Sequence, residues 1–147
     1  MISLIQRVKY AKVTINKKLY SKIDYGMLIF IGIHINDTKD DAQYLSKKIK
    51  KLRIFTDKQD KMNDTLNFSI GAILVVSQFT LYGDCTKGNR PNFLNSAKQE
   101  QAAYLYHYFI KLLKQYGCIV KSGKFGEKMD VELINDGPVT LILDTQK

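Results

Sequence analysis

The sequence contains no tryptophan and has only two prolines, two cysteines and two histidines among its 147 residues. Cys85 and Cys118 form neither a CxxC motif nor a zinc-type spacing. A disulfide between them stays an open alternative, but the pattern is more typical of a reducing compartment, so we expect a cytoplasmic protein. Metal ligands are poorly supplied, and we expect neither a metal nor another cofactor.

Long hydrophobic runs are also missing. The longest runs are MLIFIGI, which starts at Met27, and AILVV, which starts at Ala72, and both are far too short to span a bilayer. The first residues, MISLIQRVKYAK, are interrupted by Gln6 and Arg7 and lack the apolar centre of a signal peptide. We therefore expect no membrane partner.

Acidic residues are outnumbered, with 14 Asp and Glu against 23 Lys and Arg, which gives a net charge of +9. Such a charge favours an anionic partner, namely nucleic acid, acidic lipid or a phosphorylated ligand. A basic surface that only keeps the protein soluble is an equally good explanation of the charge alone. In the densest stretch, KKIKKLR at 47–53, a solvated helix face is favoured over contacts with RNA phosphates.

Hydrophobic residues make up 45% of the chain, and its length fits a single domain over residues 1–147. Apolar residues at helical spacing predict one helix from Asp37 or Thr38 to about Leu52 and a second from Ser96 to about Tyr116. Short runs rich in β-branched residues predict about seven strands, at 4–15, 19–23, 26–33, 71–81, 117–123, 129–135 and 139–144. The early connections are of hairpin length. The pattern predicts an α+β fold in which a mostly antiparallel sheet forms an open, barrel-like core with two helices.

The motif NDGPVT, at Asn135 to Thr140, separates the last two predicted strands. Asn, Asp, Gly and Pro are strong turn formers, so the simplest interpretation is a hairpin turn. However, Pro138 removes a backbone donor that the returning strand would use, which makes it an unusual hairpin residue. The position of this proline therefore calls for another explanation.

The segment SQFT, Ser77 to Thr80, ends a strand that is otherwise continuously apolar. Its hydroxyls, the Gln78 amide and the backbone N–H groups could form a site that binds an oxyanion. The alternative is a strand that turns polar where it meets solvent. A hydroxyl nucleophile would need a base, and neither His34 nor His107 has a recognisable triad neighbour in the sequence. The sequence thus shows no conventional catalytic machinery.

Two glycine-containing segments could bind a nucleotide. Arg90, in GNRPNF, suits a phosphate group. Phe125 and Met129, in GKFGEKM, could enclose a nucleobase. Both of these could equally be ordinary core residues.

Taken together, these motifs resemble those of the D-aminoacyl-tRNA deacylases. They occur in the same order as in that family, and the resemblance covers essentially all 147 residues. The pair SQxT and NxGPxT is highly specific in a chain of this length. Glu127 and Gly83 depart from the pattern, because alanine is common at both positions in the family. The motifs that carry the resemblance are QRV at 6–8, SQFTLYGD at 77–84, KGNRPNF at 87–93, GKFGEKM at 123–129 and NDGPVT at 135–140.

The resemblance implies an enzyme that hydrolyses the ester bond of D-aminoacyl-tRNA, and also of mischarged glycyl-tRNA. It implies a homodimer in which the Gly137–Pro138 peptide is cis, enters the site of the other subunit and rejects L-amino acids. Its further implications are that Arg7 and Asn135 support this gate, that water is activated by the 2′-hydroxyl of the terminal adenosine, and that DNA is not a partner. The site residues that it implies are Ser77, Gln78, Phe79 and Thr80 for catalysis and Phe125, Met129 and Arg90 for the tRNA end.

Two alternatives from other classes stay open at this point. One is a basic, non-catalytic RNA-binding dimer with an aromatic-lined base pocket. The other is an esterase for small molecules in which Thr80 is the nucleophile.

Overall fold

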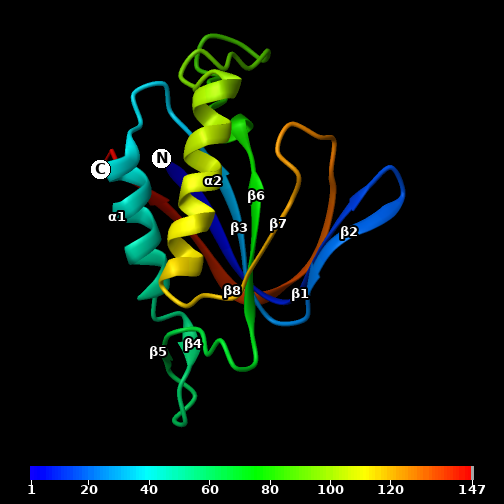
Figure 1. Ribbon diagram of the computed structural model, residues 1–147, viewed down its shortest axis with the longest axis vertical. Helices are drawn as coiled ribbons and strands as arrows, with labels where there is room; N and C mark the ends of the chain where they lie inside the picture. Colours follow the sequence, from blue (N-terminus) through cyan, green and yellow to red (C-terminus); the bar gives the residue numbers. More distant parts are fainter. Residues whose placement is uncertain (147) are drawn as a thin grey trace.

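The computed structural model describes residues 1–146. Two helices lie side by side on one face of a curved sheet, and a β-hairpin projects from the other side (Figure 1). The elements in chain order are β1 (Ile2–Ile15), β2 (Lys18–Ile23), β3 (Gly26–Gly32), α1 (Lys39–Lys50), β4 (Phe55–Thr56), β5 (Met62–Asp64), β6 (Ala72–Ser77), the 3-10 helix η1 (Phe79–Tyr82), α2 (Gln99–Gln115), β7 (Val120–Ser122) and β8 (Asp130–Asp144).

The main sheet is mixed, and the expectation of a mostly antiparallel sheet was wrong. Strand β1 pairs antiparallel with β2, β3 and β8, whereas β6 is parallel to β3 and β7 is parallel to β6. The physical reason lies in the connections, because α1 and α2 carry the chain back across the sheet before the next strand begins. Continuous apolar runs in β3 and β6, buried on both faces, are the sequence signal of such parallel strands.

The strand order is β2-β1-β3-β6-β7, with β8 on the other side of β1. The sheet curls until its ends approach, and Ser21 Oγ of β2 donates to the carbonyl of Ser122 in β7 at 2.9 Å. A second apolar cluster, which includes Val8, Leu28 and Val76, fills the curled part. The result is a nearly closed barrel, in agreement with the barrel-like core expected from the sequence.

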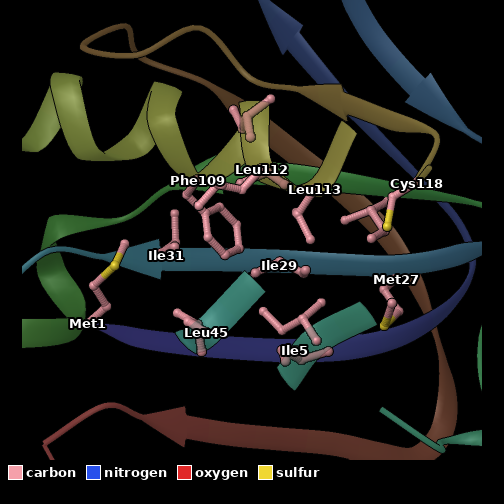
Figure 2. Packing of buried hydrophobic residues seen from close by; sticks show 14 of the residues in the cluster. Met1, Ile5, Met27, Ile29, Ile31, Leu45, Phe109, Leu112, Leu113 and Cys118 are labelled. Atoms are coloured by element: carbon pink, nitrogen blue, oxygen red, sulfur yellow. The ribbon is translucent and has the colours of Figure 1, made fainter. Parts of the chain in front are cut away.

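The larger core lies between the helices and the sheet. Helix α1 begins with a capping box, in which Thr38 and Asp41 satisfy each other's backbone N–H groups. Apolar side chains of α1 and α2 meet those of β1 and β3 in one layer, in which Leu45 and Phe109 lie close to Ile5 and Ile29 (Figure 2). No helix within residues 1–146 is long and apolar enough to cross a membrane.

The NDGPVT motif is not a hairpin turn between two strands. Its flanks belong to the single strand β8, and both pair with β1, since Asn135 lies opposite Val8 and Thr140 lies opposite Gln6. Five steps along β8 therefore match two along β1, and the extra residues bulge out of the ladder. Gly137 and Pro138 are exposed at this bulge, and the peptide bond between them is cis.

Candidate functional site

A cavity of about 690 Å³ opens where the end of β6, the start of α2 and the segment 123–129 meet. It brings together two motifs that lie far apart in the sequence, SQFT and GKFGEKM. The lining residues are Ile31, Ile33, Val76, Ser77, Gln78, Phe79, Phe93, Ser96, Ala97, Gln99, Ala102, Phe125, Gly126, Glu127, Lys128, Met129 and Val131.

One wall is the end of β6. The backbone N–H of Gln78 donates to the carbonyl of Ile31 at 2.8 Å, which fixes the point where the strand passes into η1. The first N–H groups of a helical turn have no acceptor within the turn, so the amide of Phe79, which lines the cavity, has no partner within η1. The Phe79 side chain is 56% exposed and packs edge-on against Phe93, with the ring centroids 5.0 Å apart.

The opposite wall is the segment 123–129. Phe125 is tilted against the ring of the buried Tyr106, 5.5 Å away between centroids. A Cβ atom at Gly123 would lie 2.5 Å from the sulfur of Met129, so any larger residue at this position would displace the Met129 side chain. The aromatic ring of Phe125 and the thioether of Met129 therefore line the cavity opposite the polar end of β6.

Charge at the rim comes from the same segment. Lys124 Nζ lies 3.0 Å from Glu127 Oε1, and this hydrogen bond raises the pKa of Lys124. Glu127 and Lys128 both line the cavity. From the sequence, Glu127 stood out as a departure from the family pattern.

Thr80 and Arg90 are not in the cavity lining. Thr80 is exposed, and its hydroxyl accepts from the side-chain amide of Gln78. Neither histidine forms a hydrogen bond with Thr80. His34 Nδ1 accepts from Asn36 N at 3.2 Å, and His107 Nδ1 lies 2.8 Å from the carbonyl of Ala103. Arg90 is exposed in the loop between η1 and α2.

The bulge that carries Gly137 and Pro138 is held by Arg7 and Asn135. The largely buried Arg7 forms an ion pair with Asp136, 2.8 Å from Nε to Oδ2, and donates from Nη1 to the carbonyl of Ile54 at 2.7 Å. The Asp136 contact is close without being a well-aligned hydrogen bond. The amide of Asn135 donates to the carbonyls of Arg7 and Val139, at 3.2 and 3.0 Å. The bulge is thus braced on both sides.

The bulge and the cavity lie at different ends of the sheet. Arg7 is opposite Met27 of β3, which is opposite Ile73 of β6, whereas Ser77 lies four residues further along β6. At about 3.3 Å per residue this is roughly 13 Å along the strands, in addition to the spacings across the sheet. Gly137 and Pro138 therefore do not line this cavity.

Several lining residues were missed from the sequence, among them Phe93, Ser96 and Gln99. Phe93 lies in the motif GNRPNF, where only Arg90 was considered. An aromatic residue beside a glycine-rich and proline-containing loop was the available signal. For Ser96 and Gln99, near the start of a helix, the sequence carries no such signal.

Within residues 1–146, no group of three or more His, Cys, Asp or Glu side chains gathers where it could hold a metal ion. Cys85 is exposed and Cys118 is buried, and both are free thiols. Burial raises the pKa of the Cys118 thiol above its ordinary value, so this group behaves as a core residue.

Tyr106→Phe is expected to lower the free energy of unfolding by about 1–2 kcal/mol, because a buried hydrogen bond is lost. The Tyr106 hydroxyl donates to the carbonyl of Val75 at 2.9 Å and lies 3.4 Å from that of Gly123. Burial raises the pKa of this phenol, so it stays a donor at ordinary pH. Urea unfolding measures the effect. Tyr104→Phe is the matched control on the exposed face of α2, and an equal shift in both variants would contradict the assignment.

Arg7→Ala is expected to lower the free energy of unfolding by about 2–4 kcal/mol, somewhat less than for a fully buried pair because Asp136 is 28% exposed. It also removes a brace of the Gly137–Pro138 bulge. The midpoint of urea unfolding measures this loss. Arg7→Lys, which keeps the charge, should recover part of the stability, and Arg7→Ala with an unchanged midpoint would show that the brace is unimportant.

The sequence model of the D-Tyr-tRNA(Tyr) deacylase family matches residues 4–144, nearly the whole chain. The chain belongs to this family. It is 50% identical over 143 residues to the D-aminoacyl-tRNA deacylase of Halalkalibacterium halodurans, which covers 97% of this chain and 98% of that protein. It is 51% identical over 147 residues to the D-aminoacyl-tRNA deacylase of Thermus aquaticus, covering 100% of this chain and 97% of that protein. The protein is therefore a hydrolase that acts on ester bonds.

Solved structures are similar to this deacylase-family fold. One is named c-Myc DNA unwinding element binding protein, with a TM-score of 0.92, 36% sequence identity and coverage of 99% of both chains. Another is a probable eukaryotic D-amino acid tRNA deacylase, with a TM-score of 0.79, 17% identity and coverage of 97% of both chains. The second likeness bears on the fold alone.

Proposed function

We propose that the cavity receives the aminoacylated 3′-terminal adenosine of tRNA and that the enzyme hydrolyses the ester of a D-amino acid. The observation that carries this proposal is the meeting of SQFT and GKFGEKM in one cavity. A polar strand end with available amides then faces an aromatic and thioether wall. This is the combination that an ester attached to a nucleoside requires. Because aminoacyl-tRNA is a cytoplasmic substrate, we expect the protein to work there.

The adenosine fits the apolar wall. Phe79, Phe125 and Met129 provide surfaces against which a base can stack. A volume of about 690 Å³ is within the usual range of roughly 300–1,000 Å³ for a small-molecule site. Arg90, outside the lining, would then contact the tRNA beyond its last nucleotide.

The chiral gate acts between subunits in this proposal. Gly137 and Pro138 are exposed, braced and remote from their own cavity, so their carbonyls can enter the cavity of a second subunit only. Two subunits related by a two-fold axis would exchange bulges reciprocally. The side of β8 away from β1 has no pairing strand within residues 1–146, and Ile134 and Ile142 are exposed on β8. An open edge of this kind suits a subunit interface.

Discrimination between D- and L-amino acids then follows from steric exclusion of the L side chain. The carbonyls of Gly137 and Pro138 face the α-carbon of the amino acid. They accept a hydrogen bond from its amino group or contact its α-hydrogen, and they collide with an L side chain. The gate leaves the D side chain outside the cavity, so many D-amino acids pass. Glycine has no side chain to exclude, so glycyl-tRNA is expected to be a substrate as well.

The chemistry needs no side-chain nucleophile. Water adds to the ester carbonyl, the bond to the 3′-oxygen breaks, and that oxygen leaves as the hydroxyl of free tRNA. The 2′-hydroxyl of the same adenosine positions and activates the water. The backbone amide of Phe79, which lines the cavity, holds the negative charge that develops on the carbonyl oxygen.

A second candidate function is nucleic-acid binding without catalysis. The name of one similar structure, c-Myc DNA unwinding element binding protein, and the net charge of +9 favour testing it. The esterase alternative with a Thr80 nucleophile is less well supported, because Thr80 lies outside the cavity lining and no histidine contacts it.

Hydrolysis of D-tyrosyl-tRNA and L-tyrosyl-tRNA by the purified protein tests these functions together. The proposal expects rapid loss of the D-ester, persistence of the L-ester, and no inhibition by excess duplex DNA. Binding of tRNA with no hydrolysis of either ester would establish the non-catalytic alternative. Equal hydrolysis of both esters would refute the gate.

A further inference from the structure

A shallow depression of about 520 Å³ lies on the outer face of α2, lined by His107, Ile110, Lys111, Lys114 and Gln115. His107, Lys111 and Lys114 follow one another at spacings of four and three residues, so they project from one side of the helix. All three are exposed. The lining contains no carboxylate.

Resting on the proposed function, we propose that this face of α2 binds backbone phosphates of the tRNA acceptor arm while the terminal adenosine occupies the cavity. The α2 phosphate surface is defined here as His107, Lys111 and Lys114. Two observations identify the tRNA phosphates as the partner of this surface, namely its positive charge and its continuity with the cavity.

Charge complementarity distinguishes this surface from the other lysine-rich depression. That second depression, on the β1–β2 hairpin, is lined by four lysines, at positions 9, 12, 17 and 22, but its lining also contains two carboxylates. Glu132 pairs with Lys12 at 2.9 Å, and Asp24 pairs with Lys22 at 2.5 Å. Within residues 1–146, neither Lys111 nor Lys114 lies within ion-pair distance of a carboxylate. Their charge is therefore available to an external anion.

Continuity with the cavity comes through Phe125. This side chain lines the cavity, and its ring centroid lies 6.3 Å from that of His107. The α2 phosphate surface therefore begins at the cavity rim and leads away from it along the helix.

The length of α2 also fits. Ala102 lines the cavity, and Lys111 and Lys114 lie 9 and 12 residues further along α2. At about 1.5 Å per residue this is roughly 13–18 Å. A few unpaired nucleotides at the 3′ end of tRNA can span that distance, which brings the phosphates nearer the acceptor stem beside the two lysines.

The test is the double charge reversal Lys111→Glu/Lys114→Glu. Lys9→Glu/Lys17→Glu on the hairpin is its matched control, because both lysines are exposed, neither forms an ion pair within residues 1–146, and the change in net charge is the same. Two substrates are compared, full-length D-tyrosyl-tRNA and the D-tyrosyl ester of the trinucleotide CCA, which lacks the acceptor stem. For the α2 variant we expect KM for the tRNA to rise at least about 10-fold, with kcat and the trinucleotide reaction unchanged. The slope of log(kcat/KM) against log salt should flatten by about 1–2.

Equal effects of the two double variants, equal effects on the two substrates, or no effect would overturn the α2 phosphate surface. Failure of the proposed function gives a different result, since the wild-type protein would then hydrolyse neither ester. In that case the binding of uncharged tRNA is measured instead. Weakening by Lys111→Glu/Lys114→Glu alone would still support this surface, and equal binding by both variants would overturn it.

Discussion

Gly137→Ala is expected to lower kcat/KM for D-aminoacyl-tRNA by about 10- to 100-fold while leaving the stability of the protein almost unchanged. Within its own subunit the added Cβ would meet only the side-chain oxygen of Asn135, at 3.5 Å, which is an ordinary contact. In the proposed dimer the same methyl group would enter the cavity of the partner and point at the α-carbon of the substrate. An extra methyl in a filled site costs about 1–3 kcal/mol.

This variant is informative because it separates a loss of activity from a loss of stability. Urea unfolding should show a midpoint close to that of the wild type, and hydrolysis of D-tyrosyl-tRNA should show the loss. Ser69→Thr, which adds one methyl group on an exposed loop, is the control for a change of the same size. Full activity in a folded Gly137→Ala protein would mean that Gly137 does not approach the substrate.

A substrate whose terminal adenosine lacks the 2′-hydroxyl is expected to bind normally and to be hydrolysed about 100- to 10,000-fold more slowly, the usual contribution of a positioned acid–base group. Thr80→Ala is expected to stay within about 10-fold of the wild type, because the backbone amide of Phe79 survives the change. The structural reason is that Thr80 is exposed, outside the cavity lining, and bonded to Gln78 rather than to a base.

Single-turnover rates with the normal and the 2′-deoxy ester measure this difference, and competition by the 2′-deoxy ester against the normal one checks that it binds. Thr80→Ser keeps the hydroxyl and serves as the matched variant. A well-cleaved deoxy ester together with an inactive Thr80→Ala protein would assign the chemistry to Thr80 and reverse the mechanism.

Local patterns predicted the elements well. The second helix was expected over 96–116 and covers Gln99–Gln115, and the first was expected to about Leu52 and ends at Lys50. The strand expected at 26–33 is β3, Gly26–Gly32, which lies between β1 and β6 in the sheet. Hydrophobic periodicity determines these features, since it reports which face of each element is buried.

Strand direction and the role of NDGPVT were harder to predict. Periodicity does not say which strands pair or in which direction they run, so the parallel pairs β3–β6 and β6–β7 were missed. Turn residues in NDGPVT suggested two strands, whereas tertiary pairing of both flanks with β1 makes one strand with a bulge. The hairpin-turn interpretation was therefore wrong, because the pairing of both flanks with β1 makes the motif a bulge within β8.

The site was predicted in part, and mainly through the resemblance. The structure places Ser77, Gln78, Phe79, Phe125 and Met129 around one cavity, while Thr80 and Arg90 lie outside its lining. Residues such as Ser96 and Gln99 contribute through the position of α2 against β6, which depends on the packing of the whole core. That the bulge at Gly137 lies away from its own cavity also could not be derived from the sequence, because it depends on the register of three strand pairs.

The central claim, that the gate of one subunit completes the cavity of the other, is tested most directly by complementation. Gly137→Ala carries an intact cavity, and Phe79→Ala carries an intact gate but loses a stacking surface worth about 1–3 kcal/mol. The two chains are co-expressed with different tags, and the mixed pair is purified. If the gate acts between subunits of a two-fold dimer, one of its two sites is intact, and activity should return to about half that of the wild type. Activity that stays as low as in the single variants, or a protein that is fully active as a monomer, would contradict the account.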